Sequence, residues 1–111
     1  MIMKLTKVFN DATSLSNGTA STTHYNERID ARKALVQFRI TGTANDTTTV
    51  IQFQGRLHPD ASWVTFVAFG PGGTTIGTNL SQIAEVHNTP EIRMVVSTYT
   101  AGTTINAWVL S

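Results

Sequence analysis

The sequence predicts an all-β domain, an antiparallel β-sandwich of jelly-roll type with eight or nine short strands. Thr, Val and Ile supply 36 of the 111 residues, and their branched Cβ atoms favour extended backbone over helix. Short segments of alternating apolar and polar residues recur about every 10 residues, separated by turn-forming clusters, as in sandwiches and barrels. No long stretch rich in Ala, Leu, Glu and Lys interrupts them. Because a jelly roll packs eight strands into two sheets, it fits this count best.

The chain is expected to form one domain over residues 1–111, a length that can bury a core without disulfide bonds. It has no cysteine, which excludes a disulfide framework, a thiolate zinc site and a cysteine nucleophile. The formal net charge of +1 gives no general reason to bind nucleic acid or an acidic membrane. Charged residues make up only 14% of the chain, against about 25% in typical domains. This low charge predicts a surface that is partly covered by protein.

The N-terminal quarter of the chain is polar and leaves alternatives open. Residues 4–9 alternate as a short strand does, and residues 1–9 as a whole are either the first strand of the sandwich or an arm that docks on a neighbouring molecule. Residues 19–25 are either a polar strand or an extended arm, and residues 26–32 are expected to form one short helical turn.

The strongest strand signals follow at residues 34–41 and 47–57, with a turn between them. In the second segment Ile51 and Phe53 are expected to point into the core. The two segments are expected to pair as an antiparallel hairpin. The inward face of the first segment is expected to consist of Ala34, Val36, Phe38 and Ile40.

Residues 63–69 are apolar on both faces, which predicts a central strand that is covered on both sides. A tight turn at 70–73 and weaker strands at 74–79 and 82–86 come next. The chain then reaches a second predicted hairpin, formed by residues 92–99 and 104–110.

Groups that could carry catalysis are sparse. The three histidines His24, His58 and His87 are expected at turns or on the surface, and no G-x-S-x-G nucleophile motif is present. His58 lies near Asp60, and Glu85 near His87, but neither pair has a third ligand at a recognisable spacing for a metal. We therefore predict no catalytic residue, no metal site and no cofactor.

Aromatic residues leave one binding alternative. Trp63, Trp108 and Tyr99 could line a face that stacks on sugars, as in a carbohydrate-binding module. The other interpretation is that the two tryptophans fill the core or an interface. We favour it for Trp63, which opens a strand after a turn, and leave Trp108 open.

The segment from Thr48 to Phe66 reads TTVIQFQGRLHPDASWVTF. It resembles a strand, Gly-x-Leu, Pro-Asp-Ala-x-Trp, strand signature of small virion proteins of tailed bacteriophages, and the chain is similar to their capsid decoration, or cement, proteins. This resemblance implies a jelly roll without catalytic activity, located on the capsid exterior after synthesis in the host cytoplasm. It also implies that the protein bridges major capsid subunits and self-associates as a homodimer or homotrimer. Nucleic acid and membrane are not expected partners.

The contact residues for these partners are expected in the N-terminal segment, in the loops at 58–62 and 70–75, and at one tryptophan. A second alternative is a subunit of the phage tail or of the head–tail connector. The predicted interface residues are Met1, Ile2, Met3, Leu5, Arg56, His58, Asp60, Pro71 and Trp108.

Overall fold

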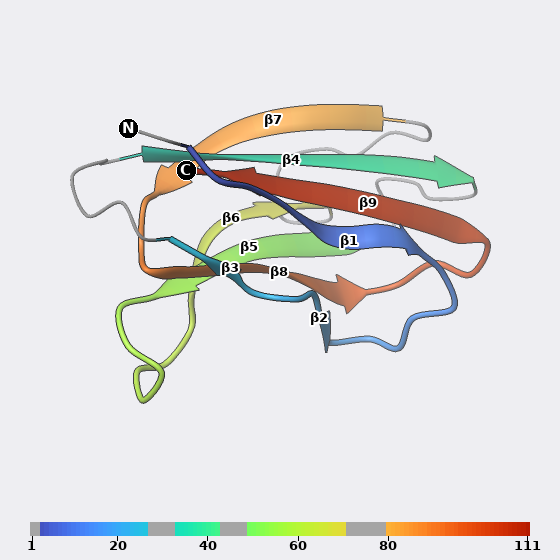
Figure 1. Ribbon diagram of the computed structural model, residues 1–111. Helices are drawn as coiled ribbons and strands as arrows, with labels where there is room; N and C mark the ends of the chain where they lie inside the picture. Colours follow the sequence, from blue (N-terminus) through green and yellow to red (C-terminus); the bar gives the residue numbers. More distant parts are fainter. Residues whose placement is uncertain (1–2, 27–32, 43–48, 71–79) are drawn as a thin grey trace.

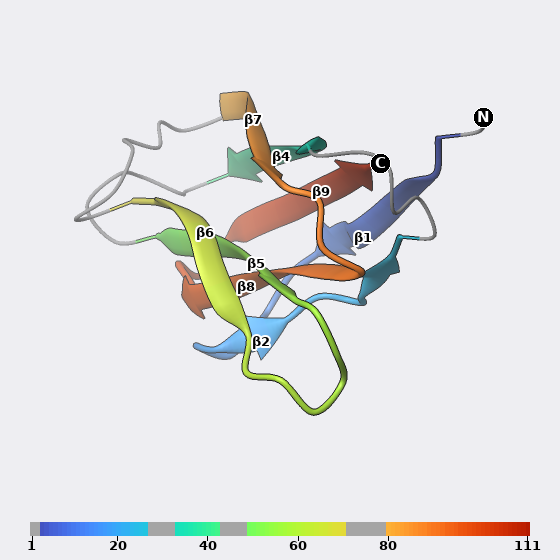
Figure 2. The ribbon, with the colours of Figure 1, turned by 90° about the vertical axis from the view of Figure 1, so that its left-hand side faces the viewer.

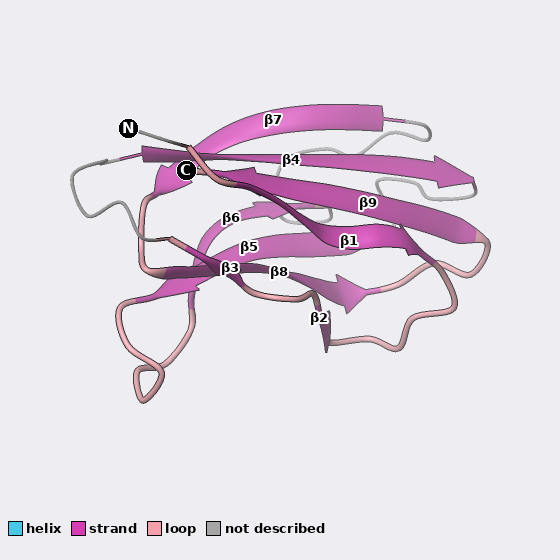
Figure 3. Ribbon diagram, in the orientation of Figure 1, coloured by secondary structure: helices cyan, strands magenta, loops and turns pink. Residues whose placement is uncertain are grey.

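The computed structural model shows two antiparallel β-sheets packed face to face (Figure 1). It describes residues 3–26, 33–42, 49–70 and 80–111. All described secondary structure is strand, as Figure 3 shows. The strands are β1 (Leu5–Ala12), β2 (Thr19–Ala20), β3 (His24–Tyr25), β4 (Lys33–Gly42), β5 (Val50–Arg56), β6 (Val64–Phe69), β7 (Leu80–His87), β8 (Glu91–Thr98) and β9 (Thr103–Leu110).

The strand order matches a jelly roll. The four-stranded sheet has the order β1-β9-β4-β7, and the five-stranded sheet has the order β2-β8-β5-β6, with β3 also paired to β8. The pairings are nested around the connection between β5 and β6: β5 pairs with β6, β4 with β7, β2 and β3 with β8, and β1 with β9. If β2 and β3 are counted as one interrupted strand, eight strands form two sheets of four. The predicted sandwich of jelly-roll type is confirmed.

Figure 2 shows the two layers from the side, with β7, β4, β9 and β1 in one and β6, β5, β8 and β2 in the other. The inner faces of both sheets supply the core, since alternate residues of each strand point inward. Phe69 of β6 packs edge-on against Phe38 of β4 and Phe53 of β5, with ring centroids 4.8 and 6.4 Å away. The largest fully buried apolar residues are Phe38, Phe53, Ile40, Ile51, Ile92, Met94, Ile105, Val36, Val96 and Val109.

Both predicted hairpins are wrong. Strand β4 belongs to the four-stranded sheet and β5 to the five-stranded sheet, so the segments 34–41 and 47–57 do not pair. The same holds for β8 and β9. The alternation of apolar residues was interpreted correctly, since the predicted inward residues of β4 and β5 are buried. Alternation identifies the face that meets the core, and it is the same whether the next strand joins the same sheet or the opposite one.

The prediction for residues 63–69 is also wrong. Among the residues that the structure describes, strand β6 lies at the edge of its sheet and pairs with β5 alone. Its first residue, Val64, is 58% exposed, and Phe69 alone in this strand is buried. A strand that is apolar on both faces need not be central, because one of its faces can belong to an exposed apolar surface.

The first strand of the sandwich is β1, which holds the edge position beside β9. Lys4 and Ser111 extend this pairing through two backbone hydrogen bonds, from Lys4 N to Ser111 O (2.6 Å) and from Ser111 N to Lys4 O (3.0 Å). Residues 19–25 form the two short strands β2 and β3.

Some predictions lie outside the described residues. These concern Met1, Ile2, Pro71, most of the predicted helical turn at 26–32, and most of the turn and strand predicted at 70–79.

Candidate functional site

The loop between β5 and β6, residues 57–63, projects from one end of the sandwich (Figures 1 and 2). Leu57 at its start is 74% exposed, the highest value among the large apolar side chains of the described residues. The loop turns where Ala61 N donates to His58 O (2.9 Å) and Asp60 N donates to His58 Nδ1 (3.1 Å). The Asp60 carboxylate lies 3.7 Å from His58 Nδ1. His58 and Asp60 therefore shape an exposed turn, the usual role of a Pro-Asp sequence.

Trp63 closes this loop on the outer surface of the five-stranded sheet. The Cζ atoms of Arg56 on β5 and Arg93 on β8 lie 4.3 and 4.1 Å from its ring centroid. Each such contact stabilises the structure by about 0.5–1 kcal/mol. Trp63 does not fill the core, because the neighbouring outward-facing Arg56 and Arg93 hold its ring on the outer surface of the sheet. The other part of the expectation, that Trp63 fills an interface, stays a prediction. At least one face of the ring is covered by guanidinium groups.

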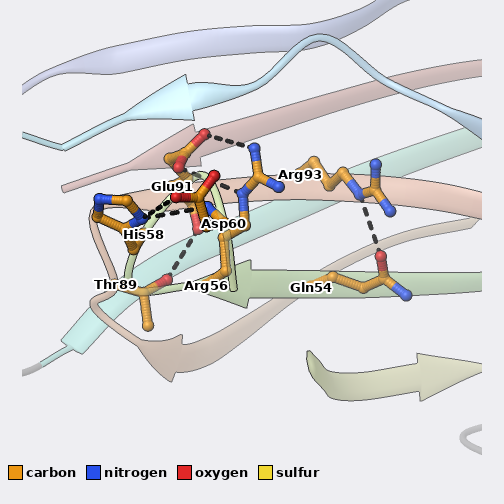
Figure 4. Close-up of polar contacts among 7 residues, drawn as sticks. All are labelled: Gln54, Arg56, His58, Asp60, Thr89, Glu91 and Arg93. Atoms are coloured by element: carbon orange, nitrogen blue, oxygen red, sulfur yellow. Dashed lines mark hydrogen bonds and ion pairs between the residues drawn. The ribbon is translucent and has the colours of Figure 1, made fainter. Parts of the chain in front are cut away.

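Arg56 also holds a carboxylate that is almost fully buried (Figure 4). Its Nε donates to Glu91 Oε2 at 3.2 Å and its Nη2 to Glu91 Oε1 at 3.1 Å. The Thr89 hydroxyl donates to the Glu91 backbone carbonyl at 2.9 Å, and Arg93 Nε donates to Gln54 Oε1 at 3.1 Å. Burial, and secondly the nearby charge of Arg56, lower the pKa of Arg93. This network fixes both ends of the loop to the sheet.

An apolar depression of about 370 Å³ adjoins the loop, lined in part by Leu57, Val64, Phe66 and His87. Phe66 packs edge-on against the His87 ring, with centroids 5.5 Å apart. Gly55 also lines it, and a Cβ atom at this position would lie 2.5 Å from the Phe66 ring. A side chain at this position would therefore force the Thr89 hydroxyl and the Phe66 ring to move, which explains the glycine of the signature.

A second exposed apolar surface lies on the outer face of the four-stranded sheet. A shallow depression of about 170 Å³ lies on it. Leu5 of β1, Leu35 of β4 and Ile83 of β7 are 64%, 39% and 65% exposed. The half-buried Trp108 and Leu110 of β9 lie between them in register, and Lys7 Nζ lies 5.3 Å from the centre of the Trp108 ring. We call this the sheet-face patch.

The described interface residues thus fall into two groups. Leu5 and Trp108 belong to the sheet-face patch, and Met3, two residues before β1, is 51% exposed. Arg56, His58 and Asp60 belong to the β5–β6 loop at the end of the other sheet. The sequence analysis predicted interface residues on both surfaces but did not show that they form two separate surfaces.

The sequence analysis missed the role of His24, which is fully buried and not at a turn or on the surface. Its Nδ1 lies 2.7 Å from the Thr6 hydroxyl and its Nε2 2.6 Å from the Ser111 hydroxyl. Burial, and secondly the charge of Lys4, lower the pKa of His24 to about 4. A neutral imidazole accepts one hydrogen bond and donates one, which the two hydroxyls can match in either tautomer. This ring joins β3 to β1 and to the residue after β9. The other two histidines, His58 and His87, are exposed as expected.

The three aromatic rings of the sugar-binding alternative lie in three different places. Trp108 is on the outer face of the four-stranded sheet, and Trp63 is on the outer face of the five-stranded sheet. Tyr99 lies in the connection between β8 and β9, where its hydroxyl donates to the Thr103 carbonyl and accepts from Ser14 N (3.0 Å). The rings therefore do not form one platform.

Within the described ranges, no three His, Asp or Glu side chains are grouped so that they could hold a metal ion. The same residues include no helix long and apolar enough to span a membrane. Comparisons of the chain with protein-family models, curated proteins and solved structures give no match.

Proposed function

We propose that the protein is a non-enzymatic structural component of a tailed-phage virion, which decorates the capsid exterior and cements it by bridging major capsid subunits. The observation that carries this proposal is the β5–β6 loop. It is built by the segment that resembles the signature of capsid decoration proteins, and it presents Leu57 beside an apolar depression. An exposed apolar group next to a concave apolar surface is typical of protein-contact sites.

The loop is prepared for binding because its ends are already fixed. Arg56 at its start is held by Glu91, and Trp63 at its end packs on Arg56 and Arg93. A loop ordered before binding loses less conformational entropy when it meets a partner. Leu57, His58 and Asp60 at the exposed turn are the proposed contacts with the major capsid protein.

A cementing protein has to make contacts in more than one direction. The β5–β6 loop and the sheet-face patch lie on different sheets of the sandwich, so one molecule can use both at once. The sparse charge of the chain, at 14% of residues, suits contacts made through apolar groups, hydroxyls and backbone. The placement of the aromatic rings supplies no comparable support for a carbohydrate-binding module.

The test is a phage particle that lacks this protein. In the phage whose genome encodes the chain, deletion is expected to leave assembled heads that release their DNA at a lower temperature than wild-type heads. Adding the purified protein back is expected to restore the heat resistance. Heads of equal heat resistance with and without the protein would refute the cementing role, and immunogold labelling of tails or connectors would favour the tail or connector alternative.

Two variants at one position test the loop itself. Leu57→Asp places a charge at the proposed contact and is expected to abolish both binding to the deleted heads and restoration of heat resistance. Leu57→Met keeps an apolar side chain and is the matched control, expected to bind as the wild type does. Because Leu57 is 74% exposed, neither change should affect folding. Equal binding of Leu57→Asp and wild type would exclude the loop as the capsid contact.

A further inference from the structure

The sheet-face patch has an arrangement of charge that points to its occupant. Two rows of side chains cross the outer face of the four-stranded sheet, as the strand registers show. The first row reads Leu5, Leu110, Leu35 and Glu85 from β1 to β7, and the second row reads Lys7, Trp108, Gln37 and Ile83. The patch therefore has a cation at its β1 edge and an anion at its β7 edge, with apolar side chains between them.

We propose that the sheet-face patch is the interface of a homodimer, in which the four-stranded sheets of two copies pack face to face. The dimer axis runs along the strands, between β9 and β4. This two-fold rotation places β1 of one copy opposite β7 of the other. It sets Leu110 of each copy against Leu35 of the second copy. Lys7 of each copy comes to lie opposite Ile83 of the second copy, one row away from Glu85, so that its long side chain can reach Glu85 diagonally.

The second copy fits because this surface is complementary to itself. A two-fold interface uses the same patch on both partners, so a cation at one edge must meet an anion at the opposite edge. Lys7 and Glu85 meet this condition, being on the two outermost strands of one sheet. Lys33 and Arg39 of β4 are exposed in the rows on either side of these two, towards the ends of the sheet, where an interface is more polar than at its centre.

The area of the sheet is sufficient for such a pair. The four strands have 8, 8, 10 and 8 residues, so the sheet measures about 26 Å by 19 Å, or about 500 Å², at the usual strand dimensions. Two copies would bury about 1,000 Å² in total, which is the lower limit for a specific interface. Face-to-face packing of sheets at about 10 Å is also the geometry that joins the two sheets within this fold. We thus expect a dimer that dissociates on dilution.

The first test is the mass of the full chain by analytical ultracentrifugation over a range of concentrations. The wild type is expected to shift from the mass of one chain, 12.0 kDa, to twice that mass. Ile83→Asp, at an exposed position in the patch, is expected to weaken the dimer by tenfold or more in Kd, as expected when an interface core residue is lost (about 10-fold for each 1.4 kcal/mol). Leu57→Asp is the matched control on the other surface and is expected to dimerise as the wild type does.

The second test examines the two-fold arrangement by charge exchange. Lys7→Glu and Glu85→Lys are each expected to weaken the dimer about tenfold, because each dimer contains the pair twice. The double variant is expected to regain most of this loss. Since β1 and β7 lie at opposite edges of the sheet, rescue has to come from contact between copies. A monomer at every concentration, a trimer, or a double variant no better than the single ones would overturn the proposal.

The two proposals can fail separately. The capsid role is tested by Leu57 on intact heads, and the dimer by Ile83, Lys7 and Glu85 in the free protein. A dimer that does not bind heads would refute the first proposal alone, and a monomer that binds heads would refute the second alone.

Discussion

We expect the protein to lose stability on mild acidification, and replacing His24 with glutamine should remove most of this loss. The folded protein keeps this imidazole neutral, since it is fully buried between the hydroxyls of Thr6 and Ser111. Burial and Lys4 lower its pKa from 6.5 to about 4. The unfolded chain therefore binds a proton at a pH where the folded protein does not. The contribution of the neutral His24 to the free energy of unfolding is therefore fully present at a pH well above 6.5 and is lost as the pH falls towards about 4.

The size of the effect follows from the two pKa values. The gap between 6.5 and about 4, at about 1.4 kcal/mol for each pH unit, corresponds to about 3 kcal/mol of unfolding free energy. About 2 kcal/mol of this should be lost between pH 7.5 and pH 5, where Asp and Glu side chains with ordinary pKa values remain mostly ionised. This is a large part of the 5–15 kcal/mol that usually separates the folded from the unfolded state.

The assay is urea denaturation of the wild type and of His24→Gln at pH 7.5, 6.5, 5.8 and 5. Glutamine retains one donor and one acceptor group but does not titrate in this range. The variant should be less stable at pH 7.5 but should lose little more on acidification. The control is His58→Gln, at an exposed turn, which should keep the full wild-type loss.

Two results would refute this reasoning. One is a wild-type loss below about 0.5 kcal/mol between pH 7.5 and pH 5, against the expected 2 kcal/mol. The other is an equal loss in the wild type and in His24→Gln. If the variant does not fold, NMR titration of the His24 imidazole in the wild type gives the pKa directly, and a value near 6.5 in the folded protein would show that the ring is not held neutral by its surroundings.

Three further substitutions test the packing around the candidate site, each measured by urea denaturation. Gly55→Ala should cost about 1–3 kcal/mol, because the new methyl group would lie 2.5 Å from the Phe66 ring; an unchanged midpoint would contradict that close contact. Phe53→Ala should cost about 3–5 kcal/mol, since this side chain is fully buried, and a cost below about 1 kcal/mol would mean that Phe53 is not in the core. Arg56→Met should cost about 3 kcal/mol, because it leaves the Glu91 carboxylate buried and unpaired; a stable variant would show that Glu91 reaches water.

Leu57→Ala is the control for these three changes. Its side chain is 74% exposed, so the unfolding free energy should change by less than about 0.5 kcal/mol. A larger loss would show that the loop packs more tightly on the sandwich than its exposure indicates.

The sequence was sufficient to predict the fold class because the period-2 alternation is strong in β4, β5 and β9. In β4, for example, Ala34, Val36, Phe38 and Ile40 are all buried, as predicted. The pairing of the strands was not predictable in the same way. A strand whose apolar face meets the core has the same pattern in either sheet, so β4 could not be assigned to β9 and β7 in place of β5.

The candidate site was predictable only in part. Residues in turns, such as His58 and Asp60, were placed correctly because Pro-Asp sequences have a local conformational preference. The ion pair between Arg56 and Glu91 joins residues that are far apart in the chain, so no local sequence pattern predicts it. His24 was misplaced for a similar reason, since β3 has two residues and is too short to show alternation.

The nested strand order also has a consequence for the rate and order of folding. The hairpin of β5 and β6 closes a short loop, whereas the outermost pair joins Leu5 to Leu110. Pairing between distant segments is slow because a large loop has to close first. We therefore expect the sandwich to fold first around the hairpin of β5 and β6, in the middle of the chain, and β1 to pair with β9 last. During synthesis β1 and β4 emerge from the ribosome long before β9, which lies between them in the finished sheet. Until β9 is made, the unpaired edges of β1 and β4 can form hydrogen bonds with other chains, which favours aggregation.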